Sequence, residues 1–406
     1  MSKQITYAPV IPLIGGMPLA AEKVLGYPPV AVYSYTGFWD NDSQYMNYQN
    51  NTLGRNLDYI IMDPNGKYTP VDFTICTPPC AGLSSMNTGK SEAIKGAGCA
   101  KNDWMYQVAK DSIDLLSAKV VIIENAPGLY STKGKPVADK LFAIAKERGY
   151  SLTLYRTNTI FHGIPQNRDR TFALLWKSDV APIMNYYDRP RAKFTEYIQD
   201  IPGDAGQRED FVKNRFTHDV YFNFITAKTG SRIAARKALL ESGYVTCLTY
   251  VIRFKLVDEC YAWAKEFATE KEANTVAHYI NKHAKGLGVW DSSLKVYDDY
   301  MNAVITRNIT DTIHPVEDRM FSVREAFHMM AFPHNFELMG GQKNYPVITQ
   351  NVPVCTAADI ITEAIKFIEN KLILSTSDHI KQTNYAKKVE FSTDSHRITL
   401  DDLGNM

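Results

Sequence analysis

Short hydrophobic runs alternate with longer amphipathic stretches between Val30 and about Trp176. Four runs rich in β-branched and aromatic residues predict strands, namely AVYSY (31–35), DFTIC (72–76), VVIIE (120–124) and TFALLW (171–176). Between them, residues 104–116 and 137–148 repeat apolar positions with helical spacing. Strands that alternate with helices predict an α/β fold with a doubly wound, mostly parallel sheet. The VVII run is apolar at every position, which is typical of an interior strand covered by helices.

The pattern changes between about Tyr187 and Pro315, where the regular alternation stops. A helix predicted over residues 260–285 is the clearest element there. The alternation returns with residues 323–332 and a final helix near 356–372, and we expect the polar chain after Ser375 to be poorly ordered. The predicted organisation is a first domain of residues 1–185, an inserted smaller domain of 186–315, a return to the first domain over 316–375, and a polar tail of 376–406.

Composition narrows the class of protein. The chain has 406 residues, of which 45% are hydrophobic and 22% charged, as in an ordinary globular protein. A formal net charge of +1 excludes a uniformly basic binder, so any surface for a polyanion must lie on one face. We find no signal peptide and no apolar run of membrane-spanning length, which predicts a soluble intracellular protein with no membrane partner. The cysteines show no metal-type spacing, which predicts reduced thiols and neither disulfides nor a metal site.

Reactive side chains follow the predicted strands. In open α/β sheets ligands bind at the carboxyl ends of the strands, where Cys80 and Glu124 are expected. Gln166, Arg168 and Arg170 precede the last strand, and their side chains could hold a polar planar ligand. Taken singly, each feature has an ordinary explanation: a small buried thiol, a capping or ion-paired carboxylate, and a solvated charge run.

Together and in this order, the motifs PPCAGLS (78–84), ENAPG (124–128) and GIPQNRDR (163–170) resemble those of the DNA cytosine-5 methyltransferase family of bacterial or phage type. Residues 314–336 and 350–360 resemble the motifs that follow its target-recognition insertion. The resemblance implies a Rossmann-like methyltransferase fold, S-adenosyl-L-methionine as cofactor and double-stranded DNA as partner. It also implies a monomer in the cytoplasm of a bacterial or phage-infected cell, of restriction-modification or phage type because no regulatory domains are attached.

The resemblance implies a role for each motif residue. Cys80 would attack carbon 6 of a cytosine flipped out of the duplex, Glu124 would protonate ring N3, and Arg170 would bind O2. Asn125 would position its loop. A methyl group would then join C5, and loss of the C5 proton would release the enzyme. The implied catalytic set is completed by Gln166, Arg168 and Pro79, and the residues after Cys80 would begin a segment that closes over DNA.

The first motif departs from the family pattern Asp-Leu-Phe-x-Gly-x-Gly-Gly. Gly15 and Gly16 remain in VIPLIGG, but Ile11 replaces the Phe and Leu13 replaces the first Gly. The usual ribose-binding Glu is also missing, and Asp40 or Asp42 is the nearest carboxylate. We therefore expect unusually weak binding of the donor. The other implied cofactor contacts are Trp39, Asp63, Pro78, Asn351 and Val354.

Candidate DNA contacts follow from the same resemblance. Residues 288–308 resemble the segment that re-enters the catalytic domain beside the DNA backbone. The insertion would supply basic phosphate contacts. The predicted DNA-binding residues are Ser84, Ser85, Ser293, Lys295, Thr306, Arg232 and Arg236.

Two other functions remain open at this point. One is a related cytosine-5 modifying enzyme with an altered one-carbon donor or a tRNA substrate. The other is a catalytically silent DNA-binding relative, which the presence of Cys80, Glu124, Gln166 and Arg170 disfavours, because a binder does not need an acid beside a thiol.

Overall fold

The computed structural model describes residues 4–84, 91, 95–199, 201, 218–243, 245–287, 293–338 and 344–391. The chain divides into two compact units. Unit 1 consists of Met1–Arg191, Met330–Leu338 and Gln350–Met406, and unit 2 of Ala192–Met329 and Met339–Thr349. Residues 316–329, which we predicted in the returning part of the first domain, thus group with the inserted unit. The roles expected for the two domains stay predictions.

Unit 1 is built on one nine-stranded sheet, with strand order β13-β12-β6-β8-β5-β4-β1-β2-β3. Its neighbouring strands are parallel except for β8, which is antiparallel to both β5 and β6, and β13, which is antiparallel to β12. The strands are β1 (Tyr7–Val10), β2 (Val32–Ser34), β3 (Tyr59–Ile61), β4 (Phe73–Cys76), β5 (Val120–Asn125), β6 (Ser151–Asn158), β8 (Asp169–Trp176), β12 (His379–Thr383) and β13 (Lys388–Phe391).

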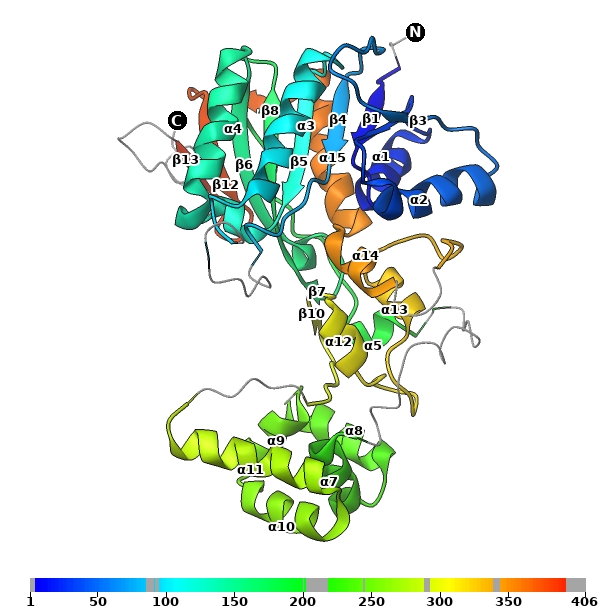
Figure 1. Ribbon diagram of the computed structural model, residues 1–406, viewed down its shortest axis with the longest axis vertical. Coiled ribbons are helices and arrows are strands. Elements are labelled where there is room, and N and C mark those ends of the chain that lie inside the picture. The colour runs from blue at the N-terminus through cyan, green and yellow to red at the C-terminus, as the bar shows by residue number, and fades with distance from the viewer. Residues whose placement is uncertain are drawn as a thin grey trace. The chain divides into compact units, whose positions relative to one another are not determined.

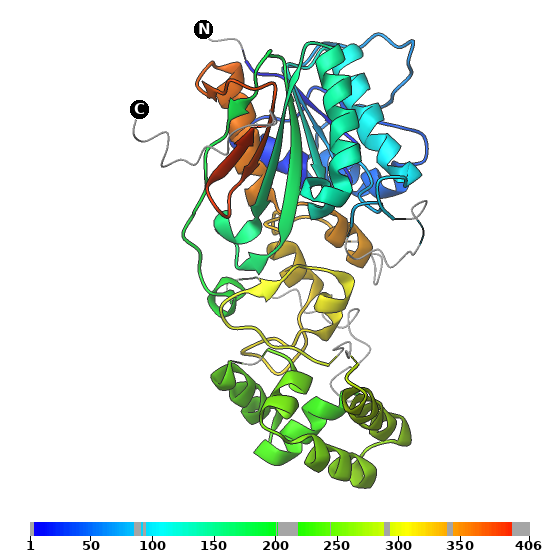
Figure 2. The ribbon, with the colours of Figure 1, turned by 90° about the vertical axis from the view of Figure 1, so that its left-hand side faces the viewer.

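Helices cover both faces of this sheet, as Figures 1 and 2 show. Helices α3 (Asp103–Asp114) and α4 (Lys135–Glu147) pack against each other and against β5 and β6. Helices α1 (Gly16–Leu25) and α15 (Val354–Ile368) form a second contacting pair, and α15 also contacts β5. Helix α2 (Trp39–Asn47) follows β2. The predicted α/β fold with a doubly wound, mostly parallel sheet is therefore confirmed.

The four predicted strands and three of the predicted helices form close to the expected positions. The sequence analysis missed the interior strand β6, because Ser and Thr alternate with Leu along it. Both sets of side chains are buried, and the polar ones find partners: the Trp176 indole donates to the Thr153 hydroxyl at 3.0 Å. A buried strand can therefore carry polar residues if their hydrogen bonds are satisfied.

The polar tail is not poorly ordered over its described part. Just before the tail, strand β11 (Ile373–Leu374) pairs with β9 (Pro182–Ile183), and within the tail β12 extends the large sheet beside β6. Ile380 and Val389 are buried, and the fully buried Gln382 accepts a hydrogen bond from Met184 N at 3.0 Å. Over residues 376–391 the expectation of disorder was wrong, because sheet pairing satisfies polar groups of this segment, and residues 392–406 lie outside the described part of the chain.

Unit 2 is mainly helical. Its core joins α7 (Val220–Thr229), α8 (Arg232–Ser242), α9 (Cys247–Arg253), α10 (Val257–Phe267) and α11 (Glu270–Ala284). The predicted single helix over 260–285 is two helices, because Thr269 caps α11 in a reciprocal capping box with Glu272. The shorter helices are α5 (Phe194–Tyr197), α12 (Thr306–Asp311), α13 (Val323–His328) and α14 (Asn344–Gln350).

Candidate functional site

The candidate reactive groups lie at one edge of the unit 1 sheet. Strands β4 and β5 are parallel neighbours, with Cys76 opposite Ile123, so both leave the sheet at the same edge. Cys80 follows the last residue of β4 by four positions, and Glu124 lies next to the end of β5. Because β8 is antiparallel to β5, its first residues, including Arg170, reach the same edge. Three motifs that are distant in sequence are thus brought together.

The backbone around Cys80 is stiff before the thiol and turns after it. Pro78 and Pro79 restrict the backbone that leaves β4. The Cys80 carbonyl accepts a hydrogen bond from Leu83 N at 3.1 Å, which closes a turn. The thiol is free and partly buried.

Glu124 is buried and ion-paired. Its side chain is 3% exposed, and Oε1 lies 2.7 Å from Arg170 Nε. Arg170 also donates from Nη1 to the Asp169 carbonyl at 2.8 Å. Burial raises the pKa of Glu124 above its ordinary value, although the Arg170 and Arg168 guanidiniums act in the opposite direction. The carboxylate is therefore easier to protonate than an exposed glutamate.

The electrostatics of Cys80 follow from the same neighbours. Burial and the Glu124 carboxylate raise the pKa of the Cys80 thiol, and Arg170 and Arg168 oppose this effect. Without a bound base the site therefore favours the neutral thiol. A nucleophile of this kind must be activated when a substrate arrives and the charges around it change.

Gln166 and Arg168 are directed into protein contacts. Arg168 is 1% exposed and donates from Nη2 to the Asn351 carbonyl at 2.7 Å. Gln166 is fully buried, and its Nε2 lies 3.7 Å from Met330 Sδ. These contacts tie the residues just before β8 to Asn351, which precedes α15, and to Met330. The direct catalytic roles implied for these two residues stay predictions.

The oxygen and the nitrogen of the Asn125 side-chain amide differ in their contacts. Its Oδ1 accepts a hydrogen bond from Ala126 N at 2.9 Å, which is consistent with positioning the loop after β5. Its Nδ2 is buried without a hydrogen-bond partner among the described residues. A buried donor of this kind beside Glu124 is available to an acceptor on a ligand.

The loop after β1 is strained. Ile11 and Leu13 adopt φ values of 56° and 52°, a left-handed conformation that costs a branched residue about 1 kcal/mol. Both side chains are buried in the main core of unit 1. Two positions at which the chain departs from the family pattern are thus filled by core side chains.

Asp42 holds this loop from α2. Its Oδ1 accepts a hydrogen bond from Leu13 N at 3.0 Å, and its Oδ2 accepts from the Ser34 and Tyr59 hydroxyls at 2.6 and 2.9 Å. Burial raises the pKa of Asp42 to about 6, against the effect of these hydrogen bonds. Asp42 therefore serves as an internal bracket for the loop.

The two glycines of the loop admit protein atoms at close range. A Cβ on Gly15 would lie 2.3 Å from the Tyr45 ring, and one on Gly16 would lie 2.4 Å from the Val352 carbonyl. Gly16 N donates to Asn351 Oδ1 at 3.1 Å. Asn351 therefore supports the loop, in addition to accepting from Arg168.

The remaining cofactor candidates differ in exposure. Trp39 is 50% exposed, and Asp40 and Asp63 are exposed too. These side chains follow β2 and β3, at the edge that also carries the loop after β1. Pro78 is buried, and Val354 is buried at the start of α15.

Two predicted DNA contacts are buried within unit 2. The Ser293 hydroxyl accepts a hydrogen bond from Leu248 N at 3.0 Å and is 3% exposed. Lys295 is 7% exposed, and its Nζ lies 3.8 Å from Asp311 Oδ2. Both side chains are therefore engaged within unit 2, and their role as DNA-binding residues stays a prediction that this burial does not favour.

The predicted arginine contacts on α8 are also engaged. Arg236 is 3% exposed and donates to the carbonyls of His314 and Glu317. Its role in DNA binding stays a prediction that these contacts do not favour. Arg232 is exposed and lies 2.6 Å from Asp318 Oδ2. Arg232 stays a predicted DNA contact. To bind a phosphate, its guanidinium would have to leave the ion pair with Asp318.

The other three DNA-binding residues stay predictions. Ser84 is partly buried and lines a pocket beside the turn that contains Cys80. Thr306 is the first residue of α12. Ser85 lies outside the described residues.

The sequence analysis missed three residues that shape the site, namely Tyr45, His162 and Asp359. Tyr45 covers Gly15, and His162 contacts Asp359 across 197 positions of sequence. No local pattern marks such a pair, because the contact depends on how α15 packs against the sheet.

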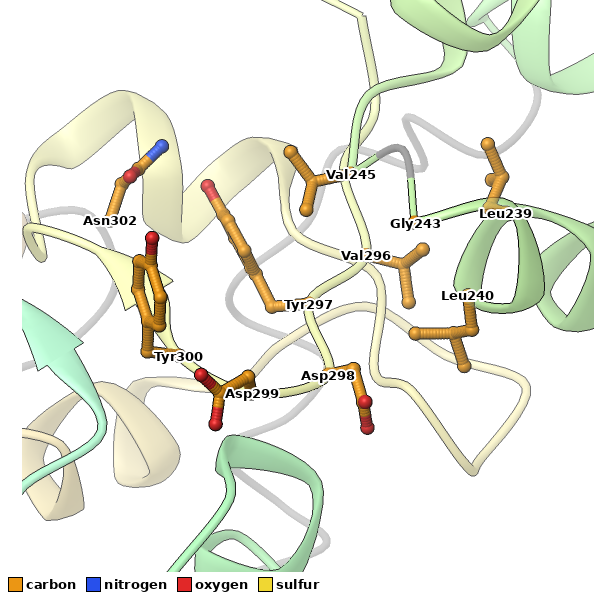
Figure 3. Close-up of a pocket in the computed structure, with 10 residues that line it drawn as sticks. All are labelled: Leu239, Leu240, Gly243, Val245, Val296, Tyr297, Asp298, Asp299, Tyr300 and Asn302. Atoms are coloured by element: carbon orange, nitrogen blue, oxygen red, sulfur yellow. The ribbon is translucent and has the colours of Figure 1, made fainter. Parts of the chain in front are cut away.

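A cavity of about 330 Å³ lies within unit 2 (Figure 3). The described residues that line it include two aspartates and no lysine or arginine. A lining of this charge does not suit a phosphate group. None of the predicted site residues lines it. The lining residues are Leu239, Leu240, Gly243, Val245, Val296, Tyr297, Asp298, Asp299, Tyr300 and Asn302.

The described part of the chain holds no cluster of three His, Cys, Asp or Glu side chains that could bind a metal ion. Across the same residues, no helix has the length and apolar character needed to cross a membrane. All six cysteines are free thiols.

Known proteins share the sequence and the fold. The pattern of the C-5 cytosine-specific DNA methylase family matches residues 13–366. Type II methyltransferase M.Bpa9945I of Bacillus paralicheniformis is 23% identical over 329 residues, covering 74% of this chain and 72% of the relative. Type II methyltransferase M.DdeI of Desulfomicrobium norvegicum is 21% identical over 358 residues, covering 79% and 80%.

Two solved structures are similar to this one. A DNA modification methyltransferase encoded within an E. coli prophage matches with a TM-score of 0.55 at 15% identity, covering 90% of this chain and 99% of the other. The Entamoeba histolytica methyltransferase EhMeth matches with a TM-score of 0.52 at 12% identity, with the same coverage. These likenesses support the Rossmann-like methyltransferase fold. Since the family pattern spans most of the sequence, the chain belongs to the C-5 cytosine-specific DNA methylase family.

Proposed function

We propose that the protein transfers a methyl group from S-adenosyl-L-methionine to C5 of cytosine in double-stranded DNA, with Cys80 as the nucleophile. The observation that carries this proposal is the meeting of Cys80, Glu124 and Arg170 at one sheet edge, with Glu124 and Arg170 ion-paired at 2.7 Å. A thiol, a buried acid with a raised pKa and a guanidinium are the groups that activation of a pyrimidine ring requires.

Each of the three side chains has a distinct task in this proposal. The Cys80 sulfur adds to C6, which places negative charge on the ring. Glu124 donates a proton to N3, and Arg170 donates hydrogen bonds to O2, so both disperse that charge. After transfer to C5, a base removes the C5 proton, the Cys80 bond to C6 breaks, and the thiolate is released.

The base must leave the helix to reach this edge. A cytosine in a duplex is stacked and paired, and extruding it costs a few kcal/mol. The turn after Cys80 leads into the segment that we expect to close over DNA. The residues 85–90 and 92–94 of that segment lie outside the described part of the chain.

The residues present fit the nucleoside end of the cofactor better than its methionine end. The exposed Trp39 ring offers a stacking face, and Asp40 and Asp63 are exposed acceptors for ribose or adenine. The backbone of the loop after β1 is less available to the methionine end, because Leu13 N and Gly16 N already donate hydrogen bonds to Asp42 and Asn351. When bound, S-adenosylmethionine would supply the methyl group as an electrophile. This arrangement supports weak donor binding.

We expect the variant Leu13→Gly to bind S-adenosylmethionine more tightly than the unmodified protein. Glycine accepts the left-handed φ of 52° without strain and removes a branched side chain from the loop. Isothermal titration calorimetry measures the change. Ile11→Phe should act in the same direction by adding an aromatic contact.

The matched control is Leu13→Ala, which removes the same bulk but keeps the strain of a Cβ at positive φ. A gain limited to the glycine variant assigns the effect to the backbone. Ordinary tight binding by the unmodified protein, unchanged by Leu13→Gly and Ile11→Phe, would show that the departure has no effect on the pocket.

Nucleoside mass spectrometry tests the proposed function. The purified protein is incubated with S-adenosylmethionine carrying a deuterated methyl group and, separately, with duplex DNA and tRNA. We expect labelled 5-methylcytosine from DNA. A product from tRNA alone, a different added group, or no product with either nucleic acid would contradict the proposal.

A further inference from the structure

A buried polar network lies behind the segment that carries the arginines. His162 is 2% exposed; its Nε2 lies 2.7 Å from the Thr157 hydroxyl, and its Nδ1 lies 2.8 Å from Asp359 Oδ2. Asp359 is 3% exposed and also accepts hydrogen bonds from Arg189 Nε at 2.9 and 3.1 Å. All four residues belong to unit 1, and the mechanism proposed above uses none of them.

The chemistry of the network fixes its hydrogen bonds. Burial alone would raise the pKa of Asp359, but the hydrogen bonds and charges of His162 and Arg189 lower it overall. Asp359 is therefore ionised and accepts only, so His162 Nδ1 carries the proton of this contact. The other ring nitrogen, Nε2, lies within hydrogen-bond distance of the Thr157 hydroxyl. The His162 ring is therefore held at both nitrogens.

The network is connected to both arginines. Thr157 of β6 lies directly opposite Arg170 of β8. Two positions later, Thr159 N donates to the Arg168 carbonyl at 3.1 Å. His162 follows directly after η5 (Thr159–Phe161), a short 3-10 helix that begins where β6 ends. The hydrogen bonds of His162 therefore help to fix the end of β6 and the turn that follows it. The segment that carries Arg168 and Arg170 pairs with both of these elements.

The other end of the network is on α15, which also reaches the loop after β1. Asp359 lies within α15, and Asn351 lies just before that helix. Asn351 accepts from Arg168 through its carbonyl and from Gly16 through its side chain, at 2.7 and 3.1 Å. A rotation or shift of α15 would therefore move both the arginine segment and the loop after β1.

We propose that His162 and Asp359 are positioning residues that set Arg170 against Glu124 through β6 and α15. Neither side chain touches the substrate. The inference rests on the proposed function, because Arg170 is given a catalytic task there. Its physical basis is that a buried, fully paired network of this kind has one geometry, and a displacement of about 1 Å at a catalytic group can cost on the order of 100-fold in rate.

The variant His162→Phe keeps a somewhat larger aromatic ring and removes both hydrogen bonds. We expect the single-turnover rate constant for methyl transfer to fall about tenfold or more, with little change in the KM for DNA. A second readout is the pH dependence. Arg170 and Arg168 are the charged groups that lower the pKa of Glu124, so a displaced Arg170 should move the alkaline fall of the rate to higher pH.

The second variant, Asp359→Asn, keeps an acceptor for His162 and should show the same changes at smaller size. The matched control is His379→Phe, the same replacement at a buried histidine of β12 whose ring stacks on Phe142 at 4.7 Å. Within the described part of the chain, His379 makes no hydrogen bond to the arginine segment, and we expect its variant to keep the wild-type rate constant and pH profile.

The experiment uses the full chain, with the active fraction taken from the amplitude of the single turnover. A merely structural role would lower that amplitude or the melting temperature, and leave the rate constant and the pH profile of the remaining enzyme unchanged; this result would overturn the inference. A shared loss in His162→Phe and His379→Phe would overturn it too. If the wild-type protein forms no 5-methylcytosine, the proposed function fails, and the inference fails with it.

Discussion

We expect Cys80→Ala to abolish methyl transfer and to leave binding to duplex DNA largely intact. In the proposed mechanism the thiolate forms the covalent bond to C6, and alanine offers no replacement. Loss of a nucleophile that acts together with its neighbours typically lowers the rate by a factor on the order of 10⁴ or more. Transfer of labelled methyl groups measures the rate, and a gel-shift titration measures DNA binding.

The matched control for Cys80→Ala is Cys260→Ala. Cys260 is a buried free thiol of α10 in unit 2 and is not one of the candidate site residues. We expect that variant to retain activity. Undiminished product from Cys80→Ala, or equal losses in the two variants, would show that Cys80 is not the nucleophile.

Glu124→Gln should slow methyl transfer by about 10²–10⁴-fold, the usual contribution of a general acid. The amide can hydrogen-bond to N3 but cannot deliver a proton. The substitution also removes the ion pair between Glu124 and Arg170, in which Glu124 Oε1 and Arg170 Nε are 2.7 Å apart. Single-turnover kinetics at saturating DNA separate this loss from an effect on binding.

The pH dependence gives Glu124→Gln an independent signature. Burial raises the pKa of Glu124, so the protonated acid persists to higher pH than in an exposed glutamate and is lost as the pH rises through that value. The wild-type rate should fall on this alkaline side, and the variant should lack that fall. An identical profile in both proteins would assign the acid to another group.

The fold was predictable where the hydrophobic pattern coincides with burial. The β5 run is apolar and buried on both faces, and α3 and α15 bury one stripe each, so periodicity located all three. The pattern failed for β6 and β12, in which buried Thr153 and Gln382 are paired by hydrogen bonds. Such partners lie far away in sequence, and no local pattern reveals them.

The candidate site was predictable to the level of its motifs. Their order placed Cys80, Glu124 and the start of β8 at strand ends, and the sheet topology brings these ends to one edge. Individual charged residues were less predictable. Lys295 and Arg236 read as surface cations, yet Asp311 and backbone carbonyls enclose them. Whether a basic residue faces DNA or the core depends on partners that only the folded chain supplies.

Covalent trapping tests the central claim most directly. Duplex DNA with 5-fluorocytosine in place of cytosine is incubated with the protein and S-adenosylmethionine. Fluorine cannot leave as a proton, so after methyl transfer the bond between the enzyme and C6 persists. The account predicts a denaturation-resistant complex whose peptide map places the adduct on Cys80. An adduct on Cys247 or Cys355, or no adduct with a protein that methylates ordinary cytosine under the same conditions, would contradict it.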